Sequence, residues 1–220
     1  ALADAFRDAT HSSGVKVVLL KGHEGCFSAG NDLGDFLNNP PTDLDAPVFR
    51  FLRMISMFPK PVVAQAQGLA IGIGTTVLLH CDLVYAASTA KFSMPFVKLG
   101  LCPEAASSLL LPISAGYQKA AELLFTAKKF DAATAVKANL VNDVVEDAYA
   151  TAQQTAQHLA ALPLASLKQS KALMKKDLAE IIACVDEEAE IFMQRVRSPE
   201  MMEAVQAFMQ KRKPDFSQFN

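Results

Sequence analysis

The sequence lacks the features that mark nucleic-acid-binding and membrane proteins. Its 220 residues carry 21 basic and 23 acidic side chains, a net charge of −2, and the basic residues form no block. Broad electrostatic binding to nucleic acid is therefore not expected. The longest nearly apolar run, residues 69–79, contains glycine and threonine and is shorter than the roughly 20 residues of a membrane helix. Neither nucleic acid nor membrane is predicted as a partner.

Cysteine and histidine are scarce and are not grouped. The four cysteines (Cys26, Cys81, Cys102 and Cys184) are widely spaced and form no CxxC pair, which argues against a disulfide framework or a zinc ribbon and favours a reducing compartment. The four histidines show no ligand spacing, so no metal site is predicted. No histidine lies close in sequence to Cys102, which is predicted to be a buried, unreactive thiol.

The common phosphate-binding and nucleophile motifs are also incomplete. Residues 72–77 begin like GxGxxG, but Val77 stands where the third glycine belongs, and no lysine precedes Thr75 as a Walker A loop requires. Two SxxK strings occur without an SDN or KTG partner, and there is no GxSxG. Binding of a dinucleotide or ATP, or a serine-nucleophile mechanism, is therefore not predicted.

What the sequence does contain is an alternation of short apolar runs and amphipathic stretches. The first eleven residues have the spacing of the second half of a helix. The patterns predict strands over 15–20, 62–66, 83–87 and 140–145, helices over 48–58, 105–115, 117–126 and 131–137, and mostly helix over 148–211. Asp131 is a plausible N-cap. This order predicts an α/β fold with a helical C-terminal region.

Two glycine-bearing loops each follow a predicted buried strand. They are residues 27–33 (FSAGNDL) and residues 68–74 (GLAIGIG). Small residues let the backbone approach a ligand, and a following helix leaves its first N–H groups without partners. Two such groups aimed at one oxygen form an oxyanion hole. Tight strand-to-helix turns would give the same composition, so each loop alone is weak support for a site.

The ordered motif set resembles the crotonase (enoyl-CoA hydratase/isomerase) superfamily along the whole chain. The segments that carry the resemblance are FSAGNDL, PKPVVAQAQGLAIGIG, CDLVYAA, FSMPFVKLGLCPEAASSLLLP and AFMQKRKPDF. The resemblance implies a crotonase-like spiral of ββα units over residues 1–147 and a helical trimerisation region over 148–220. Members of the superfamily carry about one more strand pair before the position where this chain begins. A homotrimer or hexamer is expected.

The resemblance also implies the ligand and the residues that bind it. The substrate would be an acyl-CoA thioester, so that coenzyme A is part of the substrate and no separate cofactor is expected. The thioester oxygen would accept hydrogen bonds from the backbone N–H groups of Asn31 and Ile73. The residues implied near coenzyme A are Ala29, Asn31, Leu33, Lys211 and Phe216. For Lys211 and Phe216, a merely solvated tail is an equal alternative.

The carboxylates distinguish between reactions within the superfamily. Hydratases place glutamates at the positions of Thr76 and Phe96, so both are absent here. Glu104 instead matches the catalytic glutamate of the peroxisomal-type Δ3,Δ2-enoyl-CoA isomerases. The predicted reaction converts a 3-enoyl-CoA to a trans-2-enoyl-CoA in fatty-acid β-oxidation. Phe96, Leu101 and Leu109 are candidate apolar neighbours that would raise the pKa of Glu104.

Three alternatives stay open at this point. The chain could catalyse another reaction of the superfamily, as an enoyl-CoA hydratase or dienoyl-CoA isomerase, or could be a non-catalytic CoA-binding or interaction domain. Glu104 could be no more than a first-turn helix residue after Pro103, a position that the helix dipole favours. The last three residues, QFN, differ from an SKL signal, which favours the bacterial cytoplasm over the peroxisome.

Overall fold

The computed structural model describes residues 1–219 and contains two four-stranded sheets. The order is β1-β3-β5-β8 in the first sheet and β2-β4-β6-β7 in the second. All neighbours pair in parallel except β6 and β7, which are antiparallel. The strands are β1 (Val18–Lys21), β2 (Cys26–Ser28), β3 (Val62–Ala66), β4 (Leu69–Ile71), β5 (Leu83–Ala87), β6 (Lys91–Ser93), β7 (Phe130–Asp131) and β8 (Asp143–Val145).

Successive strands alternate between the two sheets, and this alternation places the loops of interest side by side. β1, β3 and β5 enter the first sheet, while β2, β4 and β6, which follow them, enter the second. All five residues of β3 are buried, as expected for a β-branched, apolar strand with parallel neighbours on both sides. The alternation, with helices between the pairs, confirms the predicted spiral of ββα units.

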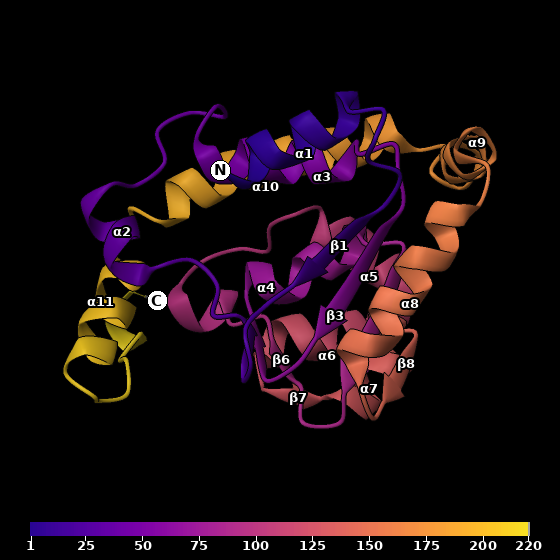
Figure 1. Cartoon of the computed structure of the whole chain (residues 1–220). Coiled ribbons are helices and arrows are strands. Elements are labelled where there is room, and N and C mark those ends of the chain that lie inside the picture. Colours follow the sequence, from indigo (N-terminus) through magenta and orange to yellow (C-terminus); the bar gives the residue numbers. More distant parts are fainter. Residues whose placement is uncertain (220) are drawn as a thin grey trace.

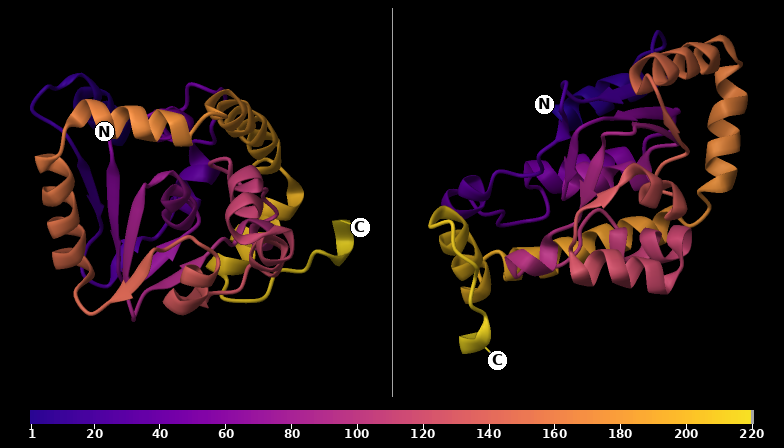
Figure 2. Two further views of the ribbon diagram at one scale, coloured as in Figure 1. Left: turned by 90° about the vertical axis from the view of Figure 1, so that its right-hand side faces the viewer. Right: turned by 90° about the horizontal axis from the view of Figure 1, so that it is seen from below.

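The helices cover the sheets and form the whole C-terminal part. Figure 1 shows α1, α3 and α10 lying together along one side of the molecule, and α8 runs beside β1, β3 and β5. Figure 2 shows the segment after α11 projecting from the body of the molecule in both views. The α-helices are α1 (Leu2–His11), α2 (Leu33–Asn38), α3 (Pro47–Ser56), α4 (Ile73–Thr76), α5 (Ser107–Ala115), α6 (Tyr117–Thr126), α7 (Ala132–Lys137), α8 (Ala148–Ala161), α9 (Leu164–Met174), α10 (Leu178–Arg195) and α11 (Pro199–Met209). Shorter 3-10 helices are η1 (Val77–His80), η2 (Phe96–Leu99) and η3 (Ser217–Phe219).

Two buried lysines join helices to the first sheet. The Lys60 amine donates hydrogen bonds to three carbonyl oxygens at the end of α1 and after it, at 2.6 to 2.8 Å. Lys171 on α9 donates to the Lys60 carbonyl oxygen at 2.8 Å and pairs with Asp82 at 2.7 Å. Asp82 also accepts the N–H of Val62, the first residue of β3. Asp82 therefore has a structural role.

The structure corrects the bounds of several predicted elements. The first strand begins at Val18 rather than at residue 15, and the last begins at Asp143 rather than at residue 140. The helix predicted over 105–115 begins at Ser107, because Ala105 and Ala106 both have left-handed backbone angles. Asp131 caps α7 as predicted, by accepting the Thr134 N–H. No helix in residues 1–219 is both long and apolar enough to cross a membrane.

Lys171→Met is expected to lower the free energy of unfolding by about 3 kcal/mol, the usual cost of leaving one member of a largely buried ion pair without its partner. The side chains of Lys171 and Asp82 are 7% and 20% exposed. Urea unfolding measures the effect, with Lys168→Met on the exposed side of the same helix as the control. Equal stability of the two variants would contradict this role for the ion pair.

Candidate active site

A cavity of about 620 Å³ lies where the two glycine loops meet α2 and α3. Its lining mixes aromatic and aliphatic side chains with a few polar and charged ones, a combination suited to a ligand with an apolar and a polar part. The lining residues are Ala1, Leu2, Ala3, Leu20, Lys21, Phe27, Ser28, Gly30, Asn31, Asp32, Asp35, Phe36, Asn39, Pro41, Ala46, Pro47, Val48, Arg50, Phe51, Ile73, Gly74 and Val77.

The parallel pairing of β2 with β4 brings the two glycine loops into contact. Ser28 pairs in register with Ala70, so the residues after each strand emerge together. A Cβ atom on Gly74 would lie 2.7 Å from the Ser28 Cβ and 2.8 Å from the Ser28 carbonyl oxygen. Gly30 has a φ of +87°, and a Cβ atom there would lie 2.9 Å from the Ile71 carbonyl oxygen. Only glycine allows the two backbones to approach this closely at these points.

Two backbone N–H groups at the cavity wall have no protein acceptor. Ile73 is the first residue of α4, so its N–H lies ahead of the helical hydrogen-bond ladder, while the Gly72 N–H before it is used by the Ser93 carbonyl oxygen. The Asn31 N–H follows Gly30, whose own N–H is held by the Ser28 hydroxyl. Within residues 1–219, the N–H groups of Asn31 and Ile73 donate to no protein oxygen. Both residues line the cavity, and neither N–H is used by another part of residues 1–219.

Glu104 is buried against α4, next to the cavity but not among its lining residues. Its side chain is almost fully covered, and its Oε1 accepts a hydrogen bond from the Thr76 hydroxyl at 2.5 Å. Ile73, Thr76 and Val77 share one face of this turn, because residues three and four apart on a helix are neighbours. Ile73 of α4 and Val77 of η1 line the cavity, so the Glu104 carboxyl is bound to the turn that forms part of the cavity wall.

The backbone around Glu104 is fixed in an uncommon conformation. Ala105 and Ala106 have φ values of +63° and +52°, which are rare for residues with a Cβ atom and are found where the surroundings enforce them. The Ala105 carbonyl oxygen lies 2.7 Å from Nε2 of His80, which must carry the proton because a carbonyl only accepts. Burial lowers the pKa of His80 to about 4, so the ring is neutral at ordinary pH.

Burial also controls the charge of Glu104. It raises the pKa of Glu104 to about 8, against a smaller opposing effect of the Thr76 hydroxyl. The carboxyl of Glu188 on α10 raises it further through like-charge repulsion. Phe96 and Leu101, two of the three apolar neighbours suggested from sequence, are buried in the same hydrophobic cluster, with Leu109 packed against it. A carboxyl group with this pKa can both take up and release a proton near neutral pH.

Several residues that contact Glu104 or its segment were not identified from the sequence. Thr76 was predicted only as a missing carboxylate, and its hydrogen bond to Glu104 depends on the packing of segment 103–106 against α4. His80 and Glu188 belong to no motif. Glu188 follows Ser108 by 80 positions, and only the amphipathic spacing of α10 could have indicated that it faces inward.

The other predicted site residues are scattered. Ala29 is exposed and Leu33 is half-buried at the start of α2, and neither lines the cavity. Asp32 caps α2 through the Gly34 N–H. Cys102 is half-buried rather than buried as predicted, and partial burial raises its pKa to about 11, so the thiol is protonated at neutral pH and poorly reactive. The first turn of α5 does not include Glu104, because the helix begins at Ser107.

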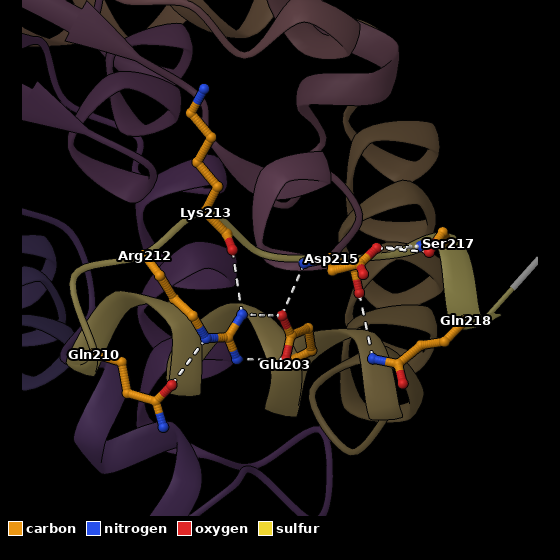
Figure 3. Close-up of polar contacts among 7 residues, drawn as sticks. All are labelled: Glu203, Gln210, Arg212, Lys213, Asp215, Ser217 and Gln218. Atoms are coloured by element: carbon orange, nitrogen blue, oxygen red, sulfur yellow. Dashed lines mark hydrogen bonds and ion pairs between the residues drawn. The ribbon is translucent and has the colours of Figure 1, made fainter.

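Lys211 and Phe216 lie in the C-terminal segment, away from the cavity lining. Figure 3 shows how this segment is held: the Arg212 guanidinium donates to both carboxyl oxygens of Glu203, at 2.5 and 2.8 Å. The Asp215 N–H donates to the same carboxylate. These contacts hold the pKa of Glu203 at about 2. Lys211 is exposed and Phe216 half-buried, so the implied contacts of either with coenzyme A stay predictions.

Comparisons with known proteins agree on one family. The family model described as enoyl-CoA hydratase/isomerase matches residues 1–219. The chain is 35% identical to the 1,2-epoxyphenylacetyl-CoA isomerase of Escherichia coli, over 98% of this chain and 86% of that protein. It is 36% identical to enoyl-CoA delta isomerase 2 of Rattus norvegicus, over 90% of this chain and 53% of that protein. A solved structure from Acinetobacter baumannii is 58% identical with a TM-score of 0.90, over 92% of this chain and 86% of that one.

Glu104→Gln is expected to stabilise the protein increasingly as the pH rises. The native carboxyl has a pKa of about 8 and the unfolded one about 4.5, so between these values unfolding releases a proton and the wild type loses stability. The glutamine variant does not lose stability in this way. The difference between its melting temperature and that of the wild type therefore grows from about pH 4.5 to pH 8 and is constant outside that range. Thermal unfolding across this range measures it, with exposed Glu146→Gln as the control. A difference that does not change with pH would contradict the burial of an ionisable carboxyl.

Proposed function

Because the chain belongs to the enoyl-CoA hydratase/isomerase family, we propose that it shifts the double bond of a 3-enoyl-CoA to give a trans-2-enoyl-CoA. The observation that carries the proposal is Glu104, a buried carboxyl with a pKa of about 8 that is hydrogen-bonded to Thr76 of α4, the helix that begins with the unpartnered N–H of Ile73. Glu104 would act as the base and then as the acid. The N–H groups of Asn31 and Ile73 would hold the thioester oxygen.

The chemistry needs one carboxylate. Ionised Glu104 takes the proton from C2, and the electron pair of that C–H bond spreads over a dienolate whose charge lies mainly on the thioester oxygen. Two N–H donors stabilise this charge by about 3 kcal/mol each in comparable sites. The protonated Glu104 then returns the proton to C4, which leaves the double bond between C2 and C3. Atoms and charge balance without water or a separate cofactor, and coenzyme A enters as part of the substrate.

The cavity suits the two ends of such a substrate. Phe27, Phe36 and Phe51 give an apolar region for an acyl chain, while Arg50 supplies a cation in the same lining. The Lys21 stem also lines the cavity, but its amine lies over the ring of Tyr149. Phosphates of coenzyme A are the anions that the Arg50 cation would attract. Contacts of coenzyme A with Ala29, Asn31, Leu33, Lys211 and Phe216 belong to this proposal and to the family resemblance.

Hydration of a 2-enoyl-CoA is the second candidate. It is favoured by one observation, the presence of a second buried carboxyl, that of Glu188, close enough to influence Glu104. Against it, the positions where hydratases have glutamates hold Thr76 and Phe96. Neither side chain can act as a carboxylate in activating water.

A homotrimer or hexamer is the proposed assembly. Large apolar side chains are strongly exposed on four helices, which is unusual for a monomer and typical of surfaces that meet another subunit. They are Ile113, Tyr117, Phe125, Leu173, Met174, Met202, Phe208 and Met209. A role in fatty-acid β-oxidation and a location in the bacterial cytoplasm stay parts of the proposal.

Glu104→Gln is expected to abolish turnover of 3-enoyl-CoAs, at least about a hundredfold, because the amide cannot accept the C2 proton. Affinity for a saturated acyl-CoA should change little, since the amide has nearly the same volume. Turnover of cis- and trans-3-enoyl-CoAs of several lengths and calorimetric binding test these points. Hydration of crotonyl-CoA should not exceed a trace in the wild type. Full activity of the variant would overturn the isomerase proposal, and robust hydration would favour the second candidate.

The rate should depend on pH through Glu104. Since the base must be ionised, kcat/KM is expected to rise with pH and level off above about 8. Thr76→Val removes the hydroxyl that stabilises the ionised carboxyl, so it should move the rise to higher pH and lower the rate at pH 7. Thr126→Val, on the exposed side of α6, is the control. A Thr76→Val profile that matches the wild type would show that this hydrogen bond does not tune the base.

A further inference from the structure

A second buried carboxyl, that of Glu188, binds the segment that follows Glu104. Glu188 is on α10 and is only 5% exposed. Its Oε1 accepts the backbone N–H of Ser108, the second residue of α5, at 2.8 Å. Its Oε2 is buried and has no hydrogen-bond partner within residues 1–219. A buried carboxyl oxygen without a partner is costly, so a structural role alone explains Glu188 poorly.

The hydrogen bond of Glu188 fixes one end of the segment from Glu104 to Ser108. At the other end, the Thr76 hydroxyl holds the Glu104 side chain and His80 holds the Ala105 carbonyl oxygen. Between these points the Ser107 N–H donates to the Glu104 carbonyl oxygen at 3.1 Å. Glu188 thus binds the same short segment that contains the two left-handed alanines. The first residue of this segment, Glu104, accepts the hydrogen bond from Thr76 of α4.

No cation neutralises the two carboxyls within residues 1–219. The basic groups nearest to them in the chain are used elsewhere: Lys98 donates to the Ala127 carbonyl oxygen, and Arg195 binds Glu200 and the Gly100 carbonyl oxygen. The remaining titratable neighbours are two thiols. Cys102 donates to the Glu188 carbonyl oxygen and Cys184 lies 3.4 Å from the Ser108 hydroxyl.

The two thiols carry no charge near neutral pH, and the ionised forms of the two carboxyls repel each other. Burial raises the pKa of Cys102 and of Cys184, so both are neutral near pH 7. Burial also raises the pKa of Glu188, against its hydrogen bonds from the Ser108 side chain and backbone. Two carboxyls that influence each other in a poorly solvated region resist ionising together.

We propose that Glu188 is a positioning residue for Glu104: it fixes the segment that presents Glu104, and its charge moves to higher pH the range in which Glu104 can act as a base. The catalytic part of this inference rests on the proposed function. The coupling between the two carboxyls is independent of the proposed function, because it requires only that both groups titrate in the folded protein.

The decisive variant is Glu188→Gln, which keeps an oxygen to accept the Ser108 N–H and removes the negative charge. The rise of kcat/KM with pH is expected to move to lower pH, so that activity in weakly acidic buffer increases severalfold relative to the plateau. Glu190→Gln, an exposed change two residues along the same helix, should leave the profile in place. A residue that merely held the fold would reduce activity without moving the profile. An unmoved profile, or one moved to higher pH, would overturn the proposal.

A second measurement does not depend on catalysis or on the folding of Glu188→Gln. Coupling between two titrating groups is reciprocal, so Glu104→Gln must make Glu188 ionise at lower pH than in the wild type. NMR titration of protein with 13C-labelled glutamate carboxyls follows Glu188 directly, and the resonance that disappears in Glu104→Gln identifies Glu104. An unchanged Glu188 titration would overturn the coupling. A changed one in a protein that isomerises no 3-enoyl-CoA would sustain the coupling while refuting the proposed function.

Discussion

The hydrogen bond between Thr76 and Glu104 joins the two halves of the candidate site. It links α4, which begins with the free N–H of Ile73, to the segment before α5, which carries the acid. Without this contact, the glycine loops would still form a cavity, but no titratable group would be tied to the helix that lines it. The hydrogen bond also partly offsets the cost of burying a carboxyl, and that burial keeps the proton affinity of Glu104 high.

The spiral arrangement makes this contact possible. Since consecutive strands enter different sheets, β2 and β4 become neighbours although a whole helical segment and β3 separate them in sequence. Their parallel register delivers both glycine loops to one edge of the second sheet, where Gly74 lies against Ser28 with no room for a side chain. β6 continues the same sheet and leads into the segment of Glu104, so three successive turns of the spiral supply the candidate site.

The site concentrates features that do not favour folding. Ala105 and Ala106 adopt left-handed angles, Glu104 and Glu188 are buried without a cation within residues 1–219, and the Ser107 hydroxyl and one Glu188 oxygen have no partner in that part of the chain. Away from the site, the Lys60 amine is fully satisfied by three carbonyl oxygens, whereas the Gln65 amide nitrogen of β3 is a further buried group without a partner in the described residues. The features of the site lower the stability of the fold locally, and the packing of the surrounding structure compensates for them. Such a local loss of stability is characteristic of functional regions.

The sequence by itself determined most of the elements and the positions of both glycine loops. Apolar runs and helix signals located β3, α6 and the C-terminal helices, because these depend on local periodicity and capping, and the glycine pattern identified both loops. The family resemblance, rather than any local pattern, singled out Glu104 and the absence of carboxylates at Thr76 and Phe96. Only the tertiary structure decided that the helix begins at Ser107, that Thr76 donates to Glu104, and that Glu188 acts on the same segment from α10. These contacts join residues far apart in the chain, and their energies depend on burial and on the proximity of charges, which no local pattern of residues specifies.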